Sequence, residues 1–195
     1  RRHTRSLCDW SSDVCSSDLA VYEGIGVVLT TDPDLWPGHV EKVLGVTEAW
    51  AEQYPQTHLA LIKALLEACE YCDDPLHREE ILGWLCRPEY LGSNPVYTRP
   101  GWIDAYPRGD GGEPQVISNY NQFFNGKTNC PDAIESLWIL TQMARWGMVA
   151  FPRNWLEISE RVNRIDIFGQ AARDLGLPDT GRDRHAICLR SEEHT

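Results

Sequence analysis

The sequence predicts an incomplete α/β fold that is mostly helical and contains two short strands. Three features predict this class: two apolar runs rich in β-branched residues, several apolar stripes with helical spacing, and Pro or Gly breaks between them. Two strands are too few to form a stable sheet. We therefore expect the strands to pair with a part of the fold that is missing from this chain.

The two ends differ from the rest of the chain. Residues 1–19 are polar, Ser-rich and without periodicity, and they end in DVCSSDL, which resembles a translated sequencing adapter. The last six residues, RSEEHT at 190–195, resemble read-through of the matching adapter. We expect both ends to be non-native and exclude them from the fold. The alternative is two natural disordered tails.

The first folded elements are predicted to be two strands and two helices. Val21–Thr31 is expected to be a buried strand, followed by a Pro- and Gly-containing loop at 32–39 and a second strand at Lys42–Val46. Thr47 is a suitable N-cap for a helix over Glu48–Tyr54. Pro55 ends that helix and is favoured as the first residue of a longer helix that extends to about Asp73.

The rest of the chain is predicted to be helical on both sides of an irregular stretch. A helix follows the Asp74-Pro75 break and ends near Cys86, and the stretch 90–115 is rich in Gly and Pro, with one helix near 96–106. Three more helices are expected, over 133–146, 155–162 and 166–175, and Gly176 is a plausible stop for the last.

The composition excludes several classes of function. The chain has 18 basic and 29 acidic residues and a net charge of −11, which argues against nucleic-acid binding. It contains no apolar run of about 18 residues that could span a membrane. Five of the seven cysteines lie outside the excluded ends; most of these five are expected to be small apolar core residues, and one disulfide remains possible.

Common enzyme signatures are absent, and we expect no enzymatic activity. The sequence has no P-loop, GxGxxG, GxSxG or HExxH motif. The alternative is a zinc-dependent deaminase, because His39-x-Glu41 and Cys69-x-x-Cys72 partly match its signature. Residue 68 is Ala where that signature has Pro, and both cysteines belong to the apolar stripe of the helix that begins at Pro55.

The loop after the first predicted strand is the best candidate site. Trp36 lies there, close to His39 and Lys42, which are among the few groups in this acidic chain that can stabilise an anion. The alternative is a loop tryptophan that covers a sheet edge beside solvated His and Lys side chains.

Four segments together resemble the nitrate- and bicarbonate-binding family of ABC-transporter solute-binding proteins: LWPGHVEKVLGVTEAWAEQYP at 35–55, LIKALLEACEYCDD at 61–74, SLWILTQMARWG at 136–147 and ERVNRIDIFGQAARDLGLPD at 160–179. The resemblance implies part of a type II periplasmic-binding fold. Residues 20–46 would then be the end of the second lobe and the strand returning to the first, 47–92 helices on the first lobe, and 93–189 a C-terminal helical extension.

The resemblance also implies a function and a site. The chain would be part of the solute-binding component of an importer for nitrate, nitrite, bicarbonate or a similar oxyanion, with a membrane permease as partner. It would be periplasmic or lipid-anchored. Lys42, His39 and Trp36 would contact the anion, and Glu41 would hold a cation, calcium, only if the ligand is bicarbonate. The alternative is a cytoplasmic nitrate sensor of the same fold, including one fused to a transporter ATPase.

Overall fold

The computed structural model describes residues 20–36, 42–117, 120–124 and 128–177. The chain divides into two compact units, and each is made of two separate segments. The first unit consists of Arg1–His39 and Cys69–Phe123, and the second of Val40–Ala68 and Phe124–Thr195. No helix among the described residues is long and apolar enough to cross a membrane.

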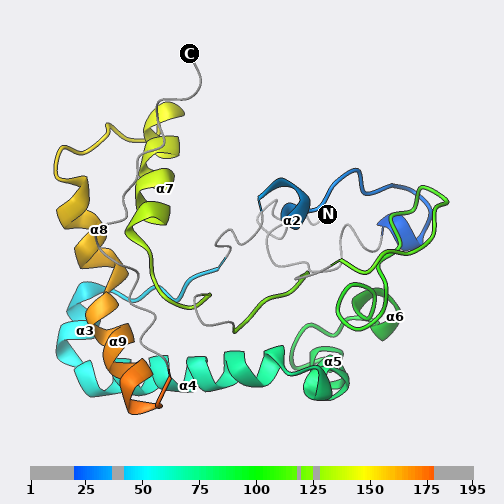
Figure 1. Ribbon diagram of the computed structural model, residues 1–195, viewed down its shortest axis with the longest axis horizontal. Helices are drawn as coiled ribbons and strands as arrows, with labels where there is room; N and C mark the ends of the chain where they lie inside the picture. Colours follow the sequence, from blue (N-terminus) through cyan, green and yellow to red (C-terminus); the bar gives the residue numbers. More distant parts are fainter. Residues whose placement is uncertain (1–19, 37–41, 118–119, 125–127, 178–195) are drawn as a thin grey trace, which may run out of the picture. The chain divides into compact units, whose positions relative to one another are not determined.

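The first unit combines short helices with turns. It contains a helical turn at 20–22, α2 (Asp32–Leu35), the last residues of α4 (Pro55–Asp73), η2 (Pro75–His77), α5 (Arg78–Leu85) and α6 (Pro95–Thr98). Helix α5 packs against α6 (Figure 1). The most buried side chains of the first unit are those of Ile81, Leu82, Thr98 and Tyr106.

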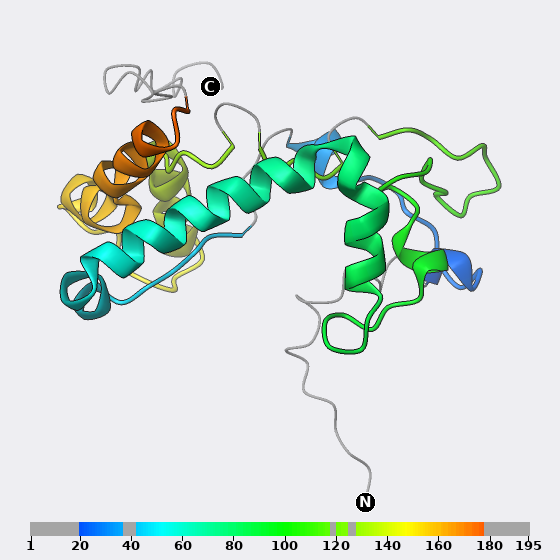
Figure 2. The ribbon, with the colours of Figure 1, turned by 90° about the horizontal axis from the view of Figure 1, so that it is seen from below.

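The second unit is a set of packed helices. It contains α3 (Glu48–Gln53), most of α4, α7 (Ala133–Arg145), α8 (Trp155–Asn163) and α9 (Ile165–Asp174). Helix α7 packs along α8 (Figure 1), and α9 lies beside the N-terminal half of α4 (Figure 2). The apolar core joins these last two helices through Leu59, Leu66 and Ala171, with Ile62 and Phe168 packed against them.

Capping residues account for several helix boundaries. The backbone N–H of Trp50 donates to Thr47 Oγ1 at 3.3 Å, so Thr47 is the N-cap of α3 as predicted. Asp74 and Asp132 accept from Leu76 N and Ile134 N at 2.9 Å, which caps η2 and α7. Gly176 has φ +68 and follows α9, as expected for a residue that ends a helix.

The structure confirms most of the predicted helices. The expected helices over 48–54, from 55 to about 73, and over 133–146, 155–162 and 166–175 all form within about two residues of their predicted ends. The helix expected between Asp74-Pro75 and Cys86 forms as η2 and α5. The helix expected near 96–106 is only the single turn of α6, because the chain turns at Pro100 and Gly101.

The two predicted strands do not form. Residues 20–22 are helical, and 26–31 and 42–47 belong to neither helix nor strand. The apolar side chains of these segments are exposed: Leu29 is 87 % and Val43 80 % exposed. A β-branched run becomes a strand only when another strand satisfies its backbone, and the described residues contain only two isolated bridges, neither of them in these segments.

Candidate functional site

Trp36 ends a short helical turn in the first unit. It is the C-cap of α2, its backbone N–H donates to Asp32 O at 2.8 Å, and its side chain is 43 % exposed. The turn begins with Thr31, whose backbone N–H and hydroxyl both donate to Asp34 Oδ2, at 3.0 and 2.9 Å. Asp34 therefore fixes the start of the turn whose end carries Trp36.

A second segment, far away in the sequence, also binds this turn. Arg108 Nη2 donates to Asp34 Oδ2 at 3.0 Å, and the Arg108 side chain is 19 % exposed. The backbone and side-chain hydrogen bonds from Thr31 and the guanidinium of Arg108 hold the pKa of the Asp34 carboxyl below its usual value. Asp34 is therefore ionised at neutral pH and remains a strong acceptor.

The structure describes two of the four predicted site residues, Trp36 and Lys42. Trp36 belongs to the first compact unit and Lys42, which is exposed, to the second. His39 and Glu41 lie outside the described residues. The proposed anion contacts at Lys42, His39 and Trp36, and the cation role of Glu41, therefore remain predictions.

The described residues offer no metal centre. They contain no group of three or more His, Cys, Asp or Glu side chains that could hold a metal ion. Cys69 and Cys72 lie on α4 and are partly buried, as the apolar stripe predicts. Burial raises the pKa of the Cys72 thiol above its ordinary value, which disfavours the thiolate that zinc needs. The zinc-dependent alternative thus gains no support from this helix.

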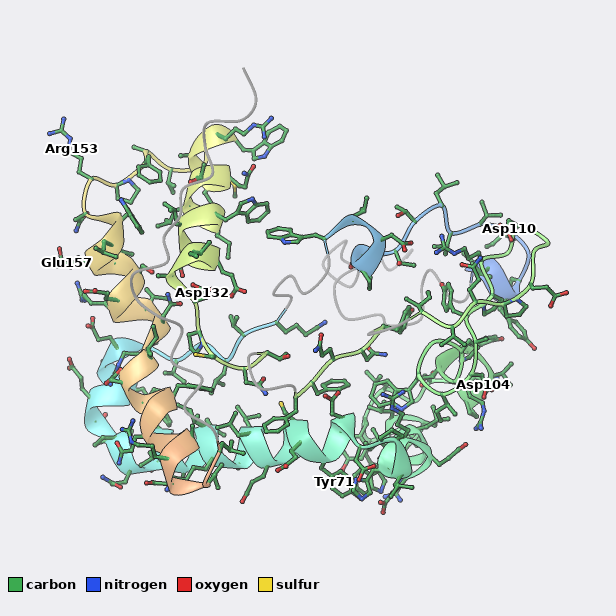
Figure 3. All side chains as sticks on the ribbon, viewed as in Figure 1. Tyr71, Asp104, Asp110, Asp132, Arg153 and Glu157 are labelled. Carbon is green, nitrogen blue, oxygen red and sulfur yellow. The ribbon has the colours of Figure 1, made fainter. Side chains whose placement is uncertain are left out.

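Two other polar clusters lie in the first unit and have no counterpart in the sequence analysis. Arg99 pairs with Glu79 and with Asp104, whose Oδ2 lies 2.8 Å from Arg99 Nε. Tyr71 lies near the end of α4 (Figure 3). Its hydroxyl donates to Glu80, and the His77 ring stacks on its ring with the centroids 3.6 Å apart. The hydrogen bond to Glu80 raises the pKa of Tyr71 above its usual value.

Buried polar groups also join helices in the second unit. Asn163 Nδ2 donates to Ser136 Oγ at 2.9 Å and to Ser159 Oγ at 3.0 Å, and Ser159 is almost fully buried. Asn163 belongs to the segment 160–179 that carries the family resemblance, but the sequence gives no sign of its partner on α7. These contacts link α7 to the end of α8.

The chain is similar in sequence to proteins of nitrate and bicarbonate transport. Residues 17–86 match the NMT1-like family. The chain is 52 % identical over 173 residues to the nitrate import ATP-binding protein NrtC of Synechocystis sp. PCC 6803, covering 89 % of this chain and 26 % of that protein. It is 47 % identical to the bicarbonate transport ATP-binding protein CmpC of the same organism, covering 87 % of this chain and 25 % of that protein.

More distant matches are binding proteins. The nitrate/nitrite binding protein NrtA of Synechococcus elongatus is 28 % identical, over 80 % of this chain and 35 % of that protein. The crystal structure of the periplasmic nitrate-binding protein NrtA from Synechocystis PCC 6803 superposes with a TM-score of 0.78 at 27 % identity, covering 83 % of this chain and 42 % of that one. The predicted family resemblance and the incomplete type II fold are thereby confirmed, and the chain spans about a quarter of its ATP-binding relatives.

Proposed function

We propose that this chain is the C-terminal part of an oxyanion-binding domain that is fused to an importer's ATP-binding subunit. The premise is that the chain belongs to the nitrate- and bicarbonate-binding family of ABC-transporter solute-binding proteins. The observation that carries this proposal is a difference in identity. The chain is 44–52 % identical to ATP-binding proteins of nitrate and bicarbonate transport but 28–29 % identical to NrtA proteins.

Fusion to an ATPase suggests a role in sensing. ATP is hydrolysed on the cytoplasmic side of an importer, so a domain in the same polypeptide as the ATPase meets the anion after import. Such a domain can change transport only if the anion binds its conformations with different affinities. We therefore propose that this domain reports the internal level of nitrate or bicarbonate to the ATPase.

The second candidate is a separate solute-binding component that delivers the anion to a membrane permease. The observation in its favour is the TM-score of 0.78 to a periplasmic nitrate-binding protein. A separate solute-binding component would be periplasmic or lipid-anchored. Coding sequence upstream separates the two: a P-loop supports the fused sensor, and a signal peptide or lipoprotein cysteine supports the delivery protein.

The proposed ligand requires two walls around it. At the ceiling of roughly −1.5 kcal/mol per non-hydrogen atom, nitrate gains about −6 kcal/mol, a dissociation constant of tens of micromolar. Approaching this ceiling needs donors to nearly every oxygen, which a closing cleft provides. Lys42, His39 and Trp36 are proposed for one wall, and the part of the fold outside this chain for the other. Glu41 is the proposed cation ligand if the anion is bicarbonate.

The test uses the protein encoded by the complete natural gene. We expect nitrate or bicarbonate to bind and to change its rate of ATP hydrolysis, and Lys42→Ala to weaken binding at least 10-fold. Lys63→Ala is the matched control, because Lys63 pairs with Asp174 in the second unit and should leave anion affinity unchanged. A protein that hydrolyses ATP but binds neither anion would refute the sensor proposal.

A further inference from the structure

We infer that Arg108 is a positioning residue that holds the Trp36 segment, residues 26–36, in the orientation needed for anion binding. The inference rests on the proposed function, because it gives Trp36 a place in the anion site. Arg108 lies in an irregular stretch of the chain and has no motif of its own. The contacts that carry the inference all lie within the first compact unit.

Arg108 contacts the Trp36 segment at three points. Its carbonyl oxygen accepts from the backbone N–H of Val28 at 2.8 Å. Its side chain donates from Nη2 to Asp34 Oδ2 at 3.0 Å and, over a longer 3.5 Å, from Nη1 to Leu29 O. One residue therefore fixes both the approach to α2 and the helical turn itself.

Hydrogen bonds within the turn that carries Arg108 stabilise it. The backbones of Tyr106 and Gln115 exchange two hydrogen bonds of 2.8 and 2.9 Å, and Gly112 N donates to Asp110 Oδ1 at 2.9 Å. We call residues 106–115 the Arg108 turn; it lies beside residues 20–26, near the label of Asp110 in Figure 3. A Cβ on Gly109 would come within 2.9 Å of Gly26 O, so the two backbones approach closely.

Helix α2 needs such external support. It has four residues, and one helical turn is unstable by itself because nucleation costs more than its few hydrogen bonds return. Trp36 caps this turn, so its side chain direction follows the turn. The fork of Arg108 supplies a directional bond that a lysine, with a single ammonium on a flexible stem, cannot reproduce fully.

The first measurement is fluorine NMR of this chain labelled with 5-fluorotryptophan, with Trp36→Phe to assign the resonance. We expect Arg108→Met to shift or broaden the Trp36 signal, and Arg108→Lys and Asp34→Asn to give smaller changes in the same direction. Arg99→Met is the matched control. It removes an Arg with two carboxylate partners in the same unit without touching the Trp36 segment. An unchanged Trp36 signal in Arg108→Met overturns the inference.

The second measurement is anion affinity in the protein from the complete gene. If the competent orientation of Trp36 falls to about a tenth of the population, the apparent affinity falls about 10-fold. We expect this loss for Arg108→Met, partial rescue in Arg108→Lys, and a change below about twofold for Arg99→Met. Equal binding by wild type and Arg108→Met refutes the inference. A wild type that binds no anion refutes the proposed function instead, and the Trp36 signal then decides the positioning role alone.

Discussion

The two compact units are stabilised in different ways. The second is a helical assembly in which α9 packs on α4 around Leu59, Leu66 and Ala171. The first holds short helices and turns together through ion pairs and stacked rings, and its segment 26–31 leaves apolar side chains exposed. The segment 42–47 of the second unit is exposed in the same way, so the units differ mainly in the core that α4 and α9 form in the second unit.

The largest expected effect is in the core of the second unit. Leu66→Ala removes a buried side chain between α4 and α9 and should lower the free energy of unfolding by about 2–5 kcal/mol. Leu29→Ala is the matched control in the first unit and should cost less than about 0.5 kcal/mol, because Leu29 is exposed. Urea unfolding measures both. A similar cost for the two would remove the contrast between the units.

The next largest effect tests the close approach in the first unit. Gly109→Ala should cost about 2–4 kcal/mol, because φ is +79 and the new Cβ would meet Gly26 O and Val21. Gly111 has φ +82 with nothing near its Cβ position, so Gly111→Ala should show only the backbone cost of about 1 kcal/mol. Equal losses in thermal unfolding would show that the Arg108 turn does not pack on residues 20–26.

A smaller effect is expected where buried polar groups join α7 and α8. Asn163→Ala leaves Ser136 and the buried Ser159 without their amide partner and should cost about 1–3 kcal/mol in urea unfolding. Asn154→Ala removes only an exposed contact with Glu157, at 3.2 Å, and should cost less than about 0.5 kcal/mol. If the two variants lose similar amounts of unfolding free energy, the hydrogen bonds of Asn163 contribute little to the stability of the second unit.

The smallest expected effect is a change in the fluorine signal of Trp36 at acidic pH. The pKa of Asp34 is lowered in the folded chain, so its contribution is present above the ordinary pKa of Asp, about 3.9, and is lost as the pH falls through the folded value. The fluorine signal of Trp36 should therefore stay constant from neutral pH down to about 4 and change below it. In Asp34→Asn that acid-dependent change should be absent. A change centred near neutral pH would assign the transition to another group.

Sequence reasoning predicted the helices because their causes are local. Thr47, Pro55 and Asp74 mark helix starts through side-chain oxygens or a fixed φ, and these effects act within a few residues. The expected strands at 21–31 and 42–46 failed because a strand depends on a partner that the described residues lack. The link between Arg108 and Asp34 joins residues 74 positions apart and has no local signal. Trp36 could be proposed from its loop, but the group that positions it could not.

We propose that Trp36, His39 and Lys42 contribute one wall of an anion cleft and that the other wall lies outside this chain. Titration calorimetry with nitrate and with bicarbonate, on this chain and on the protein from the complete gene, tests it directly. We predict binding of one anion in the micromolar range by the complete protein and no measurable heat for this chain. Micromolar binding by this chain alone, or no binding of either anion by the complete protein, would contradict the claim.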